Sequence, residues 1–228
     1  MKKSKRVIEN NKKVDKTKEY DLKEALNLLK EIKTVNFDET VELHVNLGVN
    51  PKYSEQNVRG SVVFPNGTGQ DVSVLVMTKT KVEEAEEAGA DHVGMDEYIE
   101  KIEDGWTEVD YVVATPDAMG DIGKLGRILG PRGLMPNPKS GTLTNEVAKT
   151  IKELKAGKVE FKVDKFGVLH VPVGKVSFPL DDLQENINTL LEVVMSQKPK
   201  DLKSTYLQKI TLSSTMGPGI KVNKSFVA

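Results

Sequence analysis

The spacing of apolar residues changes twice along the chain, and this change limits the folds open to it. In residues 40–47 apolar and polar residues alternate, which is typical of a strand with one buried and one solvent-facing side. In residues 71–78, DVSVLVMT, apolar and β-branched residues are almost continuous, which is typical of a strand buried on both faces. Alternation returns after Gly157. The sequence therefore predicts antiparallel strands in both flanks and a parallel sheet between them.

The middle of the chain alternates strands with helices. We expect strands at 71–78, near His92 and at 110–116, and helices at 81–88, 95–103, about 117–128 and about 144–155. This order predicts a parallel, doubly wound sheet. We therefore expect a Rossmann-like α/β domain of residues 68–159, inserted into an α+β outer domain (an antiparallel sheet with helices) of residues 1–67 and 160–228. The connections at 65–70 and 156–160 are expected to act as a hinge.

In the flanks, apolar periodicity predicts helices and antiparallel strands. Helices are expected from Leu22 to Ile32, after an N-capping Asp21, and over 181–196. Strands are expected at 40–47, 60–64, 206–214 and 219–223, with a hairpin over 159–178 that turns near Asp164–Gly167. Residues 1–18 are polar and basic without helical periodicity, so we expect no regular element there.

The composition of the chain indicates the cellular compartment in which it works. The chain has no cysteine, which excludes disulfides and thiolate zinc sites and fits a reducing compartment. It shows no apolar run of about 18 residues and no secretory signal, so we expect a cytoplasmic protein.

The net charge of −1 argues against a generic nucleic-acid binder. This average hides a polarised chain, because residues 83–121 carry fourteen acidic residues and one lysine, whereas residues 124–158 carry eight basic and two acidic residues.

The segment Gly120–Thr142, GDIGKLGRILGPRGLMPNPKSGT, holds six glycines and three prolines, which predicts a stiff, positively charged loop. Nucleotide binding is one interpretation, and a purely structural loop is another. The segment lacks a G-x-G-x-x-G that opens a helix after a strand. It also lacks G-x-x-x-x-G-K-[ST], because Pro138 precedes Lys139 and Ser140.

Two segments of the flanks are candidates for binding structured RNA by shape. SSTMGPGIK at 213–221 offers small hydroxyls, an adaptable methionine and bare backbone on a rigid turn, which suit contacts to 2′-hydroxyls and phosphates. An ordinary β-hairpin turn explains the same residues. NFDETVEL at 36–43 places Thr40 and Glu42 on the outward side of a strand, with Phe37 either in the core or against a ribose or base. An ordinary amphipathic strand is the alternative there.

Other polar residues carry weaker signals. Lys165 and Gly167 lie in the expected hairpin turn, where a solvated lysine is the simpler interpretation. The histidines at positions 44, 92 and 170 stand singly on expected strands, without a partner at metal-ligand spacing, so we expect no metal site. Neither a Ser/His/Asp arrangement nor a carboxylate pair is suggested by the local sequence, so we expect no catalytic residues and no cofactor.

Three segments, NFDETVELHVNLGVN, Gly120–Thr142 and SSTMGPGIKVN, resemble the bacterial large-subunit ribosomal protein L-one family of the mobile lateral stalk. The resemblance covers almost the whole chain from about Tyr20. It implies that the outer domain binds ribosomal RNA through Phe37, Thr40, Glu42, Lys165, Gly167, Ser213, Thr215, Met216 and Gly217. It also implies that the inserted domain faces transfer RNA with Arg127, Arg132 and Lys139. Relatives usually carry a lysine directly before the phenylalanine, where this chain has Asn36, so one phosphate-neutralising charge is missing.

The resemblance further implies a function without catalysis. Such a protein is a structural constituent of the large ribosomal subunit, assists release of deacylated transfer RNA from the exit site, and represses translation of its own messenger RNA. The expected partners are then large-subunit ribosomal RNA, exit-site transfer RNA and that messenger RNA, with no membrane, and the protein is expected to be cytoplasmic, on the ribosome, and a monomer off it. Two alternatives stay open: an α/β enzyme that binds a phosphorylated small molecule at Gly120–Thr142, and a chaperone-like binder of any RNA duplex.

Overall fold

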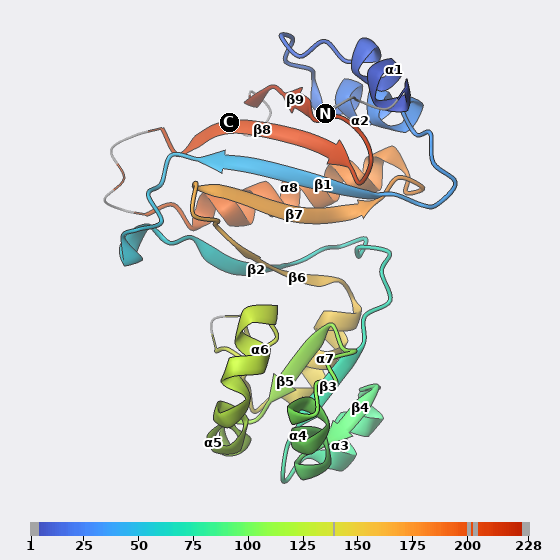
Figure 1. Ribbon diagram of the computed structural model, residues 1–228. Helices are drawn as coiled ribbons and strands as arrows, with labels where there is room; N and C mark the ends of the chain where they lie inside the picture. Colours follow the sequence, from blue (N-terminus) through green and yellow to red (C-terminus); the bar gives the residue numbers. More distant parts are fainter. Residues whose placement is uncertain (1–4, 139, 200–201, 203–204, 225–228) are drawn as a thin grey trace. The chain divides into compact units, whose positions relative to one another are not determined.

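The computed structural model describes residues 5–138, 140–199, 202 and 205–224, apart from the side chain of Ser54. Two compact units make up the chain (Figure 1). Unit 1 combines Met1–Gly69 with Val159–Ala228, and unit 2 is Gln70–Lys158. An antiparallel sheet lies in unit 1 and a separate parallel sheet lies in unit 2, so the two kinds of sheet that the apolar spacing predicts are confirmed.

Unit 1 is built around a four-stranded antiparallel sheet. Its strands follow the order β7 (Val168–Lys175), β1 (Thr40–Leu47), β8 (Leu207–Ser214) and β9 (Ile220–Val222). Burial alternates at every residue of β1, as the sequence predicts, so one face of the sheet is buried and the other is open. Helices α2 (Leu22–Glu31) and α8 (Leu180–Ser196) pack against the sheet and against each other, and their apolar stripes fill one core (Figure 1).

The remaining strands of unit 1 correct one prediction. The expected hairpin over 159–178 is wrong, because β6 (Lys158–Lys162) pairs with β2 (Arg59–Val63), whereas β7 pairs with β1. The turn between β6 and β7 is nonetheless tight, since the N–H of Gly167 donates to the carbonyl oxygen of Asp164 at 3.1 Å. The alternation of apolar and polar residues shows which face of a strand is buried, but it does not determine which strand pairs with it.

The N-terminal segment corrects another prediction. Residues Lys5–Lys13 form helix α1, although the sequence predicts no regular element there. The helix docks through a polar side chain: Asn10 is buried, and its amide donates to the carbonyl oxygen of Ile32 at 3.3 Å. Because the buried contact is an asparagine, apolar periodicity in the sequence does not reveal this helix.

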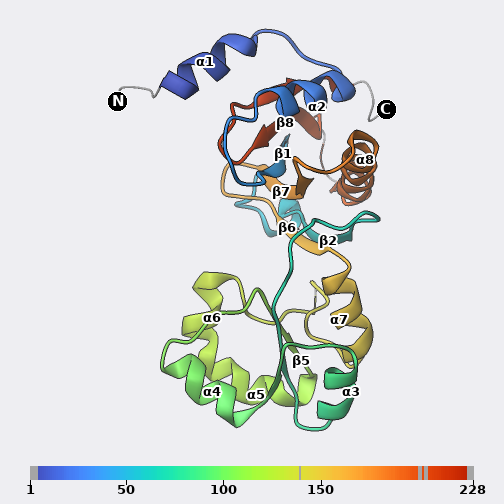
Figure 2. The same ribbon diagram turned by 90° about the vertical axis from the view of Figure 1, so that its right-hand side faces the viewer.

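Unit 2 is a three-layer α/β arrangement. Its parallel sheet has the order β4 (His92–Gly94), β3 (Val74–Met77) and β5 (Tyr111–Ala114). All four residues of β3 are buried, which confirms the predicted burial of both faces. One face packs on α4 (Asp96–Glu103), α5 (Met119–Ile122) and α6 (Gly126–Arg132), and the other on α3 (Val82–Glu87) and α7 (Val147–Lys155) (Figure 2).

The segment Gly120–Thr142 is helical over much of its length rather than a loop throughout. Short turns η2 (Pro116–Ala118) and η3 (Gly123–Leu125) flank α5, and α6 continues to Arg132. Beyond α6, the hydroxyl of Ser140 donates to the carbonyl oxygen of Asn137 at 3.0 Å, and the Asn137 N–H donates to the hydroxyl of Thr142 at 2.9 Å. Ser140 and Thr142 are also buried, so their hydroxyls face the interior of the loop, which favours the structural interpretation over nucleotide binding.

Candidate RNA-binding surface

Three chain segments meet at one end of the antiparallel sheet. Thr40 opens β1 opposite Lys175, the last residue of β7, and Val41 lies opposite Ser214, the last residue of β8. Since neighbouring strands run antiparallel, the start of β1 lies beside the ends of both its neighbours. We call residues 36–42, 175–178 and 213–217 together the three-segment surface. The structure thus brings the predicted residues of the 36–43 and 213–221 segments side by side.

A buried carboxylate holds two of these segments together. The side chain of Glu39 is only 2% exposed, and its Oε1 accepts a hydrogen bond from the N–H of Met216 at 2.8 Å and from the hydroxyl of Ser214 at 3.1 Å. Hydrogen bonds to a charged group are stronger than those between neutral groups. Glu39 therefore fixes the backbone at Met216, a residue whose side chain is exposed.

Glu39 is not among the residues predicted from the sequence, although the sequence carries a signal for it. Positions 41, 43, 45 and 47 of the strand are apolar and buried, and position 39 continues the same register. An acidic residue on the buried side of an alternating strand needs a hydrogen-bond donor nearby. Such a residue marks a structural anchor beside the outward-facing Thr40.

Thr40 and Thr215 join the same two segments through two hydrogen bonds, one to a side-chain hydroxyl and one between backbones. The Thr40 N–H donates to the hydroxyl of Thr215 at 3.0 Å, and the Thr215 N–H donates to the carbonyl oxygen of Thr40 at 3.1 Å. On the other side, the ammonium group of Lys175 donates to the hydroxyl of Thr40 at 2.9 Å. The Thr40 hydroxyl is therefore bonded to a cation at the edge of the surface.

The third segment is tied in by Asp38. The hydroxyl of Ser177 donates to its Oδ2 at 2.6 Å, and the Ser177 N–H donates to its Oδ1 at 3.1 Å. Together with the contacts of Glu39 and Thr40, these bonds tie the three segments of the surface to one another. A rigid surface loses little conformational entropy on binding, which suits recognition by shape.

Two large apolar side chains of the three-segment surface are exposed. Phe37 is 50% exposed and Met216 is 45% exposed, on segments that Glu39 joins. The alternative in which Phe37 lies in the core is wrong. A single exposed apolar residue is ordinary, but two on segments that are bonded to each other mark a candidate contact surface.

The open face of the sheet continues from this end along β1. Glu42 lies opposite Ser213, and His44 lies opposite both Thr211 and His170. The expectation that the histidines stand singly is wrong for two of them, because the Nδ1 atoms of His44 and His170 are 2.8 Å apart. Their separation of 126 positions in the sequence conceals this pairing. The Nε2 atom of His44 is 2.8 Å from the hydroxyl of Ser213.

The environment of His44 predicts a pH dependence of stability. Burial lowers the pKa of His44 below its ordinary value of 6.5, and the charge of His170 lowers it further, whereas Glu42 opposes the shift. The unfolded chain then binds more protons than the folded chain, so the free energy of unfolding falls as the pH drops through about 6.5. We expect His44→Gln to lose less stability than the wild type between about pH 7.5 and about pH 5.5. Urea unfolding at the two pH values measures this difference, and equal losses would contradict it.

Lys165 and Gly167 lie elsewhere in unit 1. The carbonyl oxygen of Gly167 accepts from the N–H of Leu47, the last residue of β1, so this turn lies at the opposite end of the strand from Thr40. At about 3.3 Å per residue the two ends are roughly 23 Å apart. Phe166, between them in sequence, is 74% exposed. The predicted RNA-binding residues therefore form two patches, and the three-segment surface holds the larger set.

The predicted transfer-RNA-facing residues belong to unit 2. Arg127 and Arg132 are exposed on α6, and Lys139 lies outside the described residues.

Among the helices of the described ranges, none has the length and apolar character that a membrane span requires. In the same part of the chain, no three histidine, cysteine or acidic side chains are grouped so as to hold a metal ion.

Comparison with known proteins connects this geometry to a family. Residues 28–218 match the Ribosomal protein L1p/L10e family. The chain is 59% identical to the large ribosomal subunit protein uL1 of Chlorobaculum tepidum over 218 residues, which are 95% of this chain and 94% of that protein. It is 58% identical to the uL1 protein of Chlorobium luteolum over 217 residues, covering 94% and 95% of the two chains. These relatives are ribosomal proteins, so the alternative of an α/β enzyme is wrong. From the length and identity of these matches, the chain belongs to the Ribosomal protein L1p/L10e family and is a ribosomal protein, not an enzyme.

Proposed function

We propose that this chain is a structural constituent of the large ribosomal subunit and binds ribosomal RNA through the three-segment surface. Unit 1 is the RNA-binding domain of this proposal, and unit 2 is a Rossmann-like domain inserted into it. The names of the relatives place them in the large subunit. The observation that carries the proposal is the bond between buried Glu39 and the Met216 N–H, which fixes the backbone of an exposed methionine against the segment that carries Phe37.

The contacts follow from the chemistry of the surface. The residues that would meet RNA are Phe37, Thr40, Glu42, Ser213, Thr215, Met216 and Gly217. Hydroxyls and exposed backbone contact 2′-hydroxyls and phosphates, while the two apolar side chains pack against ribose or base. The Glu42 carboxylate accepts from a 2′-hydroxyl or a guanine amino group. Lys165 and Gly167, at the other end of β1, would contact a second part of the same folded RNA.

Binding of a large-subunit RNA fragment tests this function. The purified chain should prefer that fragment over a scrambled hairpin of equal length at moderate salt. Equal affinity for the two RNAs would contradict the proposal and would favour the alternative of a chaperone-like protein that binds any RNA duplex.

The proposal also predicts a shallow dependence of affinity on salt. Each neutralised phosphate contributes about 0.7–0.9 to the slope of the logarithm of the binding constant against the logarithm of salt concentration. The three-segment surface holds one lysine, Lys175, and position 36 holds an asparagine. We expect a slope no steeper than about −6, measured by filter binding over a salt series. A steeper slope would mean that charge rather than shape dominates.

Two further roles are proposed for the protein on and off the ribosome. On the ribosome, unit 2 would help release deacylated transfer RNA from the exit site, with Arg127, Arg132 and Lys139 facing that RNA. Crosslinks from α6 to exit-site transfer RNA test this role, and their absence on ribosomes with a filled exit site would contradict it. For this role we propose that the connections between the units act as a hinge.

Off the ribosome, the cytoplasmic monomer would repress translation of its own messenger RNA through a similar RNA fold. Repression should begin only when ribosomal sites are filled, so the messenger must bind more weakly. A tenfold difference in affinity, about 1.4 kcal/mol, is enough for the ribosomal site to fill before the messenger site. Competition between the ribosomal RNA fragment and the messenger leader measures this order, and tighter binding to the messenger would contradict it.

A further inference from the structure

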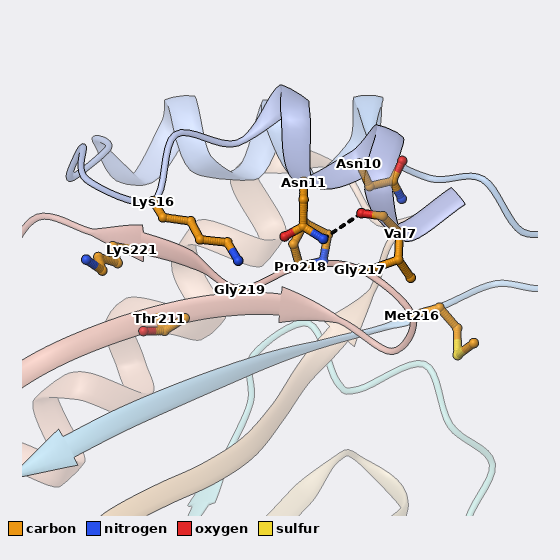
Figure 3. A pocket seen from close by; sticks show the side chains of 10 residues that line it. All are labelled: Val7, Asn10, Asn11, Lys16, Thr211, Met216, Gly217, Pro218, Gly219 and Lys221. Carbon is orange, nitrogen blue, oxygen red and sulfur yellow. Dashed lines mark hydrogen bonds between the residues drawn. The ribbon is translucent and has the colours of Figure 1, made fainter. Parts of the chain in front are cut away.

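A groove lies between helix α1 and the turn that joins β8 to β9. It encloses about 490 Å³, and we call it the α1 groove (Figure 3). Its lining residues are Val7, Asn10, Asn11, Lys16, Thr211, Met216, Gly217, Pro218, Gly219 and Lys221. Met216 and Gly217 belong to the three-segment surface as well, so the α1 groove adjoins it directly.

The wall that α1 contributes is docked on the rest of unit 1. Asn10 bonds the carbonyl oxygen of Ile32, as described above, and its amide also lies 3.5 Å from the hydroxyl of Thr34. After the helix, Val14 is buried, and the N–H of Asp15 donates to the Tyr20 hydroxyl at 3.0 Å. Lys16 is therefore held close to the turn, and its side chain extends toward Gly219 (Figure 3).

The groove combines positive charge with apolar walls. Lys16 and Lys221 are exposed cations, and neither forms an ion pair with any described residue. Among the described lining residues none is acidic. Val7, Pro218 and Met216 supply apolar surface, and helix α1 itself carries four basic residues and one acidic residue.

We propose that the α1 groove binds one unpaired nucleotide of the RNA that occupies the three-segment surface, an inference that rests on the function proposed above. The base lies against Val7, Met216 and Pro218, and the phosphate lies between Lys16 and Lys221. The volume falls within the range of about 300–1,000 Å³ that is usual for small-ligand sites, which suits a nucleotide. Unstacked bases are the parts of folded RNA that proteins read on apolar and aromatic surfaces.

Charge removal and steric blocking test the groove separately. The double variant Lys16→Gln/Lys221→Gln removes both cations, and Asn11→Trp fills the groove without changing net charge. Lys23 and Lys198 are exposed lysines of unit 1 outside the groove, so Lys23→Gln/Lys198→Gln is the matched control. All variants are first compared with the wild type by circular dichroism. Affinity is then measured for the large-subunit RNA fragment and for the scrambled hairpin.

We expect the groove double variant to bind the fragment about tenfold more weakly and to lose about 0.7–0.9 from the salt slope, because the two lysines hold one phosphate. Asn11→Trp should also weaken binding about tenfold, whereas the control pair should stay close to the wild type. If the wild type prefers the fragment but both groove variants match the control, the α1 groove is not a binding site and the proposed function stands. If the wild type shows no preference for the fragment, the proposed function fails, and the nucleotide site fails with it.

Discussion

Replacing Glu39 with alanine is expected to weaken binding of the large-subunit RNA fragment by at least about tenfold and to lower the free energy of unfolding by about 1.5–3 kcal/mol. The change leaves the Met216 N–H and the Ser214 hydroxyl without their acceptor at a site that is almost fully buried. The turn that carries Met216 then loses its fixed position relative to Phe37. Filter binding measures the affinity, and urea unfolding measures the stability.

Glu39→Gln provides the matched control for this prediction. Glutamine keeps one acceptor oxygen and nearly the same volume, so the bond to the Met216 N–H can persist. We expect its affinity to lie much closer to the wild type than that of the alanine variant. An alanine variant that is less stable yet binds RNA as tightly as the wild type would show that the turn needs no anchor for recognition.

Alanine at Met216 is expected to weaken RNA binding by about 1–3 kcal/mol while leaving unit 1 folded. The side chain is 45% exposed, so its truncation removes little from the core, and surface substitutions usually change stability by less than about 0.5 kcal/mol. Thr215→Ala should weaken binding by a similar about 1–3 kcal/mol, because it removes the hydroxyl that accepts from the Thr40 N–H. Affinity and thermal unfolding are measured on the same preparations.

Met195→Ala is the control for the methionine change. Met195 is 39% exposed on α8, a comparable exposure on an element that contributes nothing to the three-segment surface. Its truncation should leave RNA affinity unchanged. Unchanged affinity in both the Met216 and Thr215 variants would remove the 213–217 segment from the binding site.

The sequence predicts the kinds of sheet well because burial leaves a direct mark on residue spacing. Val41 and Leu43 alternate with Thr40 and Glu42, and the structure places the first pair in the core and the second on the open side. The continuous apolar run of β3 likewise predicts helices on both faces of its sheet. In each strand the decisive information lies within a few neighbouring residues.

Features that depend on distant residues could not be predicted in this way. The pairing of His44 with His170 and of β6 with β2 follows from which strands become neighbours, and alternation does not contain that information. Helix α1 was missed because its buried contact is the polar Asn10. Glu39 could have been found, since its place in the β1 register puts a carboxylate on the buried side.

The most direct test of the three-segment surface is a methyl NMR titration of the full chain, labelled at its methionines, with the large-subunit RNA fragment. Met216 is assigned from a Met216→Leu variant, and the buried Met77 and the exposed Met195 serve as internal references. We predict that the Met216 methyl signal shifts on RNA binding while the signals of Met77 and Met195 do not. A Met216 signal that stays unchanged when the RNA is fully bound would contradict the account.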